Sequence, residues 1–169
     1  MKSVYLAAMV LLLSISALAQ PDPIEDGWKG IKLFETRRQQ VEKLFGPPKS
    51  TTSKLYTVYP TSEGTVAIEY SAEPCTDAPA KRGEFNIEKD TVISFVVTPA
   101  KPFPLSELNS AKDLSDRPRD QHRLGYFLIG NRKNRIGIST RLEEDGTERA
   151  VQIVFAPTVE QIRQHQCTK

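Results

Sequence analysis

The chain has 169 residues, 26% of them charged, and a formal net charge of +2 at pH 7. This length is sufficient for one domain with a buried core. The nearly neutral balance, without a polybasic run, argues against a nucleic-acid partner, and no pattern typical of a metal or cofactor site is present. We therefore expect no metal, no cofactor and no nucleic acid.

The first nineteen residues, MKSVYLAAMVLLLSISALA, are organised like a secretory signal peptide. Lys2 gives a basic start, residues 4–13 form an apolar core, and the small-x-small run at 17–19 is a cleavage site. The apolar run is too short to favour a membrane span. We expect cleavage near Ala19 and a single α+β domain over residues 20–169, exported to the periplasm or the extracellular medium.

The expected mature chain contains two cysteines, Cys75 and Cys167. In an exported protein such a pair is typical of a disulfide bond. In the chain-entropy description, a disulfide that closes a loop of this length stabilises the fold by on the order of 4–5 kcal/mol. The alternative is a reactive or metal-binding thiol pair. Neither a C-x-x-C motif nor zinc-finger spacing is present, although His165 lies two residues before Cys167.

The first predicted helix lies within TRRQQVEKLFGPP, residues 36–48. Thr36 is expected to be the N-cap residue, with Gln39 completing a capping box. An apolar stripe at helical spacing is made by Val41, Leu44 and Phe45. Gly46 suits a left-handed position after the helix, and the two following prolines prevent its continuation.

Three strands are expected after this helix. A loop at residues 61–64 separates two strands in which Tyr59 faces Val66 and Thr57 faces Ile68; the same register pairs Leu55 with Tyr70. The third strand covers residues 91–99. Its predicted inward side chains are Ile93, Phe95 and Val97.

Residues 135–155 predict a β-hairpin around Asp145-Gly146, the strongest two-residue turn signal. The pairs on the buried face are then Thr140 with Val151, Ile138 with Ile153, and Ile136 with Phe155. Upstream, a loop at residues 131–134 would connect this hairpin to a further strand at residues 124–130. This strand would pair Ile129 with Ile136 and Phe127 with Ile138. The result is a half-buried meander.

The two halves of the chain share this layout. Adding 70 to the residue numbers of the first helix and of the two strands after it gives the corresponding segments of the second half. Adding 58 to the residue numbers of the first half's third strand gives the third strand of the second half. Ser106 would cap the second helix, and a last helix would start at Thr158 and end near Cys167. We predict an α+β two-layer domain, built from two helix-plus-three-stranded antiparallel meander units at 36–99 and 106–157, with a C-terminal helix. Either duplication or independent origin of the units would give this fold class.

The pattern T-x-x-Q-x-V-x-x-L-F-G-P-P, followed by a strand containing Tyr56 and a hairpin, resembles the SmpA/OmlA (BamE-like) family of outer-membrane assembly lipoproteins. The doubled layout is similar to the β-lactamase-inhibitory protein fold, a tandem of such units. The resemblance covers mainly residues 31–70. It departs from the lipoprotein pattern because Gln20, not a cysteine, follows the expected cut. Members of both groups are non-catalytic binders, so the resemblance implies protein interaction.

Catalytic chemistry is not predicted. Ser139 belongs to no complete G-x-S-x-G motif, because Arg141 occupies the last glycine position, and we expect it to face outward from a strand. His122 and His165 are expected at the surface. The carboxylates at 143–145 lie at a predicted hairpin tip, where nothing desolvates them to raise a pKa. We therefore assign no catalytic residue.

Two features suggest a binding function. Residues 101–141 carry nine basic and four acidic side chains, and they contain most of a candidate interaction patch: Arg117, Arg119, Arg123, Arg132, Lys133 and Arg135. Arginine forks suit carboxylates and phosphates, although a solvated charged face is the alternative. Trp28 either covers one end of the core or is an exposed anchor for a partner.

The leading functional hypothesis is an exported, non-catalytic binding or inhibitor-like protein that acts through its sheet face or hairpin loops. Its partner would be another protein or an acidic component of the envelope. The alternatives are a small secreted enzyme with an Arg/carboxylate site and an envelope-assembly factor.

Overall fold

The computed structural model describes residues 28–51, 56–75, 85–107, 120–123, 126–131 and 136–167, with residues 120–123 and 126–131 described by their backbone. The predicted signal peptide lies outside these ranges. The described helices are α1 (Arg38–Phe45), the 3-10 helix η1 (Leu105–Glu107) and α3 (Val159–His165). The described strands are β1 (Ser50–Thr51), β2 (Tyr56–Thr61), β3 (Gly64–Tyr70), β4 (Val92–Pro99), β5 (Phe103–Pro104), β6 (Asp120–Arg123), β7 (Tyr126–Asn131), β8 (Ile136–Leu142) and β9 (Glu148–Phe155).

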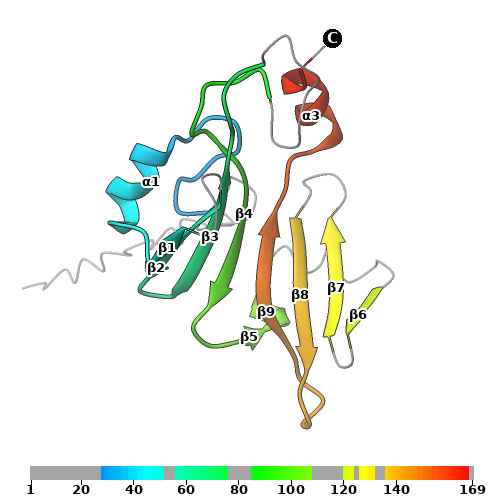
Figure 1. Cartoon of the computed structure of the whole chain (residues 1–169). Coiled ribbons are helices and arrows are strands. Elements are labelled where there is room, and N and C mark those ends of the chain that lie inside the picture. Colours follow the sequence, from blue (N-terminus) through cyan, green and yellow to red (C-terminus); the bar gives the residue numbers. More distant parts are fainter. Residues whose placement is uncertain are drawn as a thin grey trace, which may run out of the picture.

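The strands form one sheet in the order β1-β2-β3-β4-β9-β8-β7-β6, and β5 pairs with the start of β9. Every pairing within the described strands is antiparallel. The predicted α+β class is therefore confirmed. Helix α1 lies beside the β1–β2 side of the sheet, whereas α3 and the β8–β9 turn lie at opposite ends of the strands (Figure 1).

The core lies on one face of the sheet, which we call the inner face. Alternate residues of the long strands are buried there: Tyr59, Val66, Ile68, Tyr70, Phe95, Val97, Ile136, Ile138, Ile153 and Phe155. Val41 of α1 and Trp28 join the same cluster. Burial of one such side chain stabilises the fold by about 1.5–3 kcal/mol, so this face provides the main driving force for folding.

The β2–β3 pairing has the predicted register. Tyr59 lies opposite Val66, and Thr57 lies opposite Ile68. The connection is shorter than predicted, because Thr61 still pairs with Gly64 and only two residues remain in the turn. Leu55 lies outside the described residues.

The β8–β9 hairpin has a longer turn than predicted. The Gly146 N–H donates to the Glu143 carbonyl at 3.0 Å, and the Glu143 N–H donates to the Thr147 carbonyl at 3.0 Å. Residues 144–146 therefore form the turn, with Gly146 at φ 80°, and this arrangement is typical of a three-residue hairpin loop.

The extra turn residue changes one predicted pair. Thr140 lies opposite Ala150, so the predicted Thr140–Val151 pair is wrong. A bulge that leaves Val151 without a partner then restores the predicted pairs Ile138–Ile153 and Ile136–Phe155.

The β7–β8 register differs from the prediction by two residues. Ile129 lies opposite Ile138 instead of Ile136, and Phe127 lies opposite Thr140 instead of Ile138. Side chains alternate along a strand with a period of two, so an even shift keeps the same alternation. The hydrophobic pattern distinguishes registers that differ by one residue but not registers that differ by two, and for this reason the predicted register was wrong.

Helix α1 begins one residue later than predicted. Arg37 is the N-cap residue, and its N–H donates to Gln40 Oε1 at 2.8 Å, so Gln40 replaces Gln39 in the capping box. Thr36 is buried, and its Oγ1 accepts a hydrogen bond from the Lys32 N–H at 2.9 Å. Thr36 thus closes the preceding turn.

The end of α1 agrees in part with the prediction. Gly46 has φ 79°, and its N–H donates to the Glu42 carbonyl at 2.8 Å. Val41 is fully buried and Phe45 packs against the core, but Leu44 is 53% exposed, so its predicted burial is wrong.

The two later predicted helices differ in how they compare with the structure. Ser106 lies within η1, and most of the second predicted helix falls in residues 108–119, outside the described part. Helix α3 begins as predicted. Thr158 Oγ1 accepts from the Gln161 N–H at 3.1 Å, and Gln161 Oε1 accepts from the Thr158 N–H at 2.9 Å.

Candidate functional site

The face of the sheet opposite the core, which we call the outer face, carries a continuous row of small and apolar residues. In register across five strands, this outer row consists of Val58, Ala67, Val96, Val154 and Gly137. Each of these residues is half-buried. The row therefore presents an apolar band that no described helix covers (Figure 1).

The rows beside it are also poor in charge. One consists of Tyr56, Glu69 and Ser94, and the other contains Pro60, Thr65 and Thr98. Among these residues Glu69 alone is charged, and its Oε2 accepts a hydrogen bond from Ser94 Oγ at 2.7 Å. Depletion of charge around apolar and aromatic residues is typical of the centre of protein interfaces.

An arginine pair lies on the same face near the β8–β9 turn. Arg141 and Arg149 are directly opposite each other on β8 and β9. Arg141 donates from Nε at 3.0 Å and from Nη2 at 2.7 Å to Glu143 Oε1. Like charges at opposed positions destabilise a sheet unless acidic groups compensate them. This end of the face can therefore accept a carboxylate.

An open hollow of about 550 Å³ adjoins this pair. It is lined by Pro102, Arg141, Glu143, Glu144, Asp145 and Arg149. The pKa of Asp145 is lowered, first by hydrogen bonds from Thr147 and further by the positive charge of Arg149. The ionised Asp145 is unsuited to donate a proton, so the hollow is better suited to ionic binding than to general acid catalysis.

A second, smaller hollow lies between the end of α1 and the β2–β3 turn. It encloses about 380 Å³ and includes Leu44, Phe45 and Pro60. Beside it, Lys29 Nζ donates to Glu63 Oε1 at 2.7 Å. This hollow is mainly apolar and open to solvent.

A group of partly buried polar contacts surrounds Arg38 in the first turn of α1. Its Nη1 donates to Thr57 Oγ1 at 2.9 Å and its Nε donates to Asp90 Oδ1 at 2.9 Å. The guanidinium carbon lies 4.0 Å from the centroid of the Tyr70 ring, a cation–π contact. These contacts join α1 to β2, β3 and the turn before β4, so they have a structural role.

Tyr70 and Tyr59 form a hydrogen-bonded pair beneath Arg38, with 3.0 Å between their hydroxyl oxygens. Burial raises the pKa of both phenols; at Tyr70 the hydrogen bond to Tyr59 raises it further. Both hydroxyls therefore stay protonated at neutral pH, and neither provides a nucleophile or a base.

The structure places Trp28 in the core. Trp28 is 8% exposed, and its ring lies 5.7 Å from the Phe45 ring and has Lys29 Nζ 5.2 Å from its centroid. This burial matches the core-covering role considered for Trp28. Of the six predicted basic residues, Arg123 is in β6 and is described by its backbone, and the others lie outside the described residues. The basic patch therefore stays a prediction.

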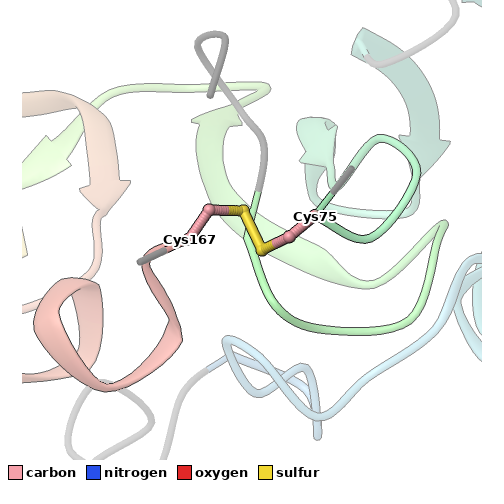
Figure 2. The surroundings of a disulfide bond; sticks show 2 residues. All are labelled: Cys75 and Cys167. Carbon is pink, nitrogen blue, oxygen red and sulfur yellow. A yellow bond between two sulfur atoms is a disulfide. The ribbon is translucent and has the colours of Figure 1, made fainter. Parts of the chain in front are cut away.

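Cys75 and Cys167 are bonded, with sulfurs 2.00 Å apart and Cα atoms 5.6 Å apart (Figure 2). The bond links the segment after β3 to the segment after α3, across 92 positions of sequence. The cysteines are therefore paired as expected.

Ser139 and His165, two side chains that were considered for catalysis, lie in the described part of the chain. Ser139 lies on the outer face with Gly137 and Arg141, as predicted, although it is only 8% exposed. The His165 ring stacks on the Phe34 ring at a centroid distance of 4.6 Å and is half-buried. His122 lies in β6, which is described by its backbone.

Neither the outer row nor the Arg141–Arg149 pair was predicted from the sequence. Alternation identifies Val58, Ala67 and Val96 as outward residues, but their continuation onto Val154 depends on the β4–β9 pairing. That pairing joins strands far apart in sequence, and no local signal specifies it.

Within the described ranges, no helix is long and apolar enough to cross a membrane. The same residues contain no group of three or more His, Cys, Asp or Glu side chains placed to hold a metal ion. No protein-family model matches the chain, and the curated proteins and solved structures compared with it contain no match either. The SmpA/OmlA resemblance therefore stays a prediction.

Proposed function

We propose that the protein is an exported, non-catalytic binding protein that recognises another protein through the outer face of its sheet. The observation that carries the proposal is the charge-poor outer row across β2, β3, β4, β9 and β8. In a chain with 26% charged residues, such a face is unusual for a surface that contacts only water.

The arginine pair adds a preference for an acidic partner. Arg149 extends beside Arg141 at one end of the outer face, where carboxylates of a partner can form forked hydrogen bonds. The predicted basic patch at 117–135 would extend this preference. Support for binding over catalysis comes from the protonated tyrosines and the ionised Asp145. An inhibitor or an envelope-assembly factor would each use a face of this kind.

Export is part of the proposal. It is supported by the signal-peptide pattern at residues 1–19 and by the Cys75–Cys167 disulfide, a bond that persists in oxidising compartments. The mature protein would begin near Gln20.

We also propose that the two halves of the sheet are tandem meander units. Strands β2–β3–β4 and β7–β8–β9 would be the units, meeting at the β4–β9 pair. The sequence shift of 58 relates Val96 to Val154, and these two residues are direct partners in the structure. That coincidence is what a local twofold relation between the units would produce.

Substitution of the outer row tests the binding proposal. Val154→Lys places a charge within the row, and Leu142→Lys adds the same charge to an exposed aliphatic side chain near the hairpin turn. The mature protein and both variants are immobilised in parallel and incubated with an envelope extract of the native host. We expect Val154→Lys to retain about tenfold less of the partner, whereas Leu142→Lys behaves like the parent.

Two outcomes contradict the proposal. One is equal retention of the partner by both variants, with unfolding in urea verifying that each is folded. The other is turnover by the purified protein that Arg149→Ala abolishes, which would favour the Arg/carboxylate enzyme.

A further inference from the structure

Helix α3 contributes little to the core. None of its residues is buried, and among the described residues the cluster of buried side chains contains none after Phe155. Its first residue, Val159, is 59% exposed. A helix of seven residues is not stable by itself in water. Its position must therefore depend on a few specific contacts.

Those contacts gather at its C-terminal end. The carbonyl of His165 accepts a hydrogen bond from the Asn86 N–H at 2.7 Å, and Gln166 forms a β-bridge with Phe85. The next residue, Cys167, carries the disulfide to Cys75 (Figure 2).

The His165 ring stacks on one member of an aromatic pair. Its ring is nearly parallel to that of Phe34, with an interplanar angle of 15° and 4.6 Å between centroids. Phe34 also contacts Phe85 edge-on, at 5.3 Å. Phe34 has φ 63°, a conformation that bulky residues rarely adopt, and its N–H donates to the Val92 carbonyl at 2.8 Å. The chain thus holds Phe34 in an unfavourable backbone conformation at the place where α3 docks.

We propose that the disulfide is a redox-sensitive latch for α3. Both cysteines are half-buried, so a dithiol can reach the bond, and the core of the sheet is built without α3. When the bond is reduced, α3 leaves the Phe34–Phe85 pair and uncovers these rings, while the sheet stays folded. The latch acts at the end of the strands opposite the β8–β9 turn and does not depend on the proposed binding face (Figure 1).

The chemistry is thiol–disulfide exchange with a dithiol. One thiolate of the dithiol attacks a cystine sulfur, the Cys75–Cys167 bond breaks, and a mixed disulfide forms. The second thiolate displaces the protein sulfur and closes the reagent's own disulfide. Two electrons pass to the cystine, the dithiol is oxidised, and the two protons of its thiols end on Cys75 and Cys167.

Hydrogen–deuterium exchange on the mature protein tests the latch, with dithiothreitol as the dithiol. In the oxidised protein we expect the amides of Ile162 and Gln166, which donate to carbonyls of α3 and its N-cap, to be protected. After reduction they should exchange at unprotected rates, while β3, β4, β8 and β9 remain protected. Trp28, the single tryptophan, should keep the emission of a buried indole.

A Cys75→Ser/Cys167→Ser variant is the control for the reagent. Without dithiothreitol it should show the exchange pattern of the reduced parent, and dithiothreitol should not change it. The proposal is overturned if α3 stays protected after reduction. It is overturned equally if the strands lose protection together with α3, because the bond would then support the whole fold.

Discussion

At the scale of single residues, Arg38 joins parts of the chain that are distant in sequence. Its guanidinium contacts Thr57, Asp90 and the Tyr70 ring, and Thr57 is fully buried. A buried hydroxyl that loses its partner is costly because water does not replace the lost hydrogen bond.

We therefore expect Arg38→Met to lower the free energy of unfolding by about 2–3 kcal/mol. Arg37→Met is the matched control, because Arg37 pairs with Glu88 at the surface, where an ion pair contributes at most about 1 kcal/mol. Unfolding in urea measures both. Equal losses in the two variants would contradict the structural role of Arg38.

The Tyr59–Tyr70 pair predicts loss of stability in alkali. The pKa of each phenol is raised in the folded protein, first by burial, whereas both lie near 10 in the unfolded chain. Above pH 10 the unfolded chain therefore releases protons that the folded protein keeps. The free energy of unfolding should fall by up to about 1.4 kcal/mol per pH unit for each tyrosine, with no effect below pH 9.

Urea unfolding between pH 8 and 11.5 measures this slope. A Tyr59→Phe/Tyr70→Phe variant should have a flatter slope over the same range. An unchanged slope would show that other groups cause the loss.

At the scale of elements, the two hairpin turns use glycine for different reasons. Gly64 has φ 145°, and a Cβ added there would overlap the Thr98 carbonyl oxygen and approach the Ala100 nitrogen. Gly146 has φ 80° with open space around it. The first glycine is required by conformation and by contact with β4, the second by conformation alone.

Gly64→Ala should therefore cost about 3–5 kcal/mol, because backbone strain and steric overlap add. Gly146→Ala should cost only about 1–2 kcal/mol. Thermal and urea unfolding of the two variants provide the comparison. A smaller loss for Gly64→Ala than for Gly146→Ala would exclude the close approach between the turn and β4.

The strands could be predicted from alternation, and the helix ends only approximately. The inward residues of β2, β3 and most of β4 follow from the pattern, because burial selects every second residue. At the start of β4 a register shift pairs Tyr70 with Val92, so Val92 belongs to the core cluster in place of the predicted Ile93. The position of the α1 N-cap did not follow, because the preceding turn uses the Thr36 hydroxyl. The exposure of Leu44 did not follow either, since it depends on how α1 is rotated against β2.

At the scale of the whole molecule, the pair β4–β9 joins the two sides of the sheet into one core. Phe95 and Phe155 lie opposite each other there, and their rings stack at 4.3 Å. The outer row crosses the same pair through Val96 and Val154. The candidate binding face therefore exists only when both sides are joined, which explains why local sequence patterns did not reveal it.

Phe155→Ala should lower the free energy of unfolding by about 3–5 kcal/mol. Because the core is continuous, Trp28 fluorescence and far-UV circular dichroism should report one shared transition at a lower urea concentration. A Trp28 transition that stays at the parent midpoint while the dichroism shifts would show that the two sides unfold independently.

The bulge at Val151 has a consequence for how the chain can change in length. The β8–β9 turn is one residue longer than the predicted two-residue turn, and the bulge takes up that residue before the strands reach Ile138 and Ile153. A deletion in the turn together with deletion of Val151 would leave these core partners in place. The tip of this hairpin can thus gain or lose residues in compensated steps, so its sequence is freer to diverge than that of the strands it connects.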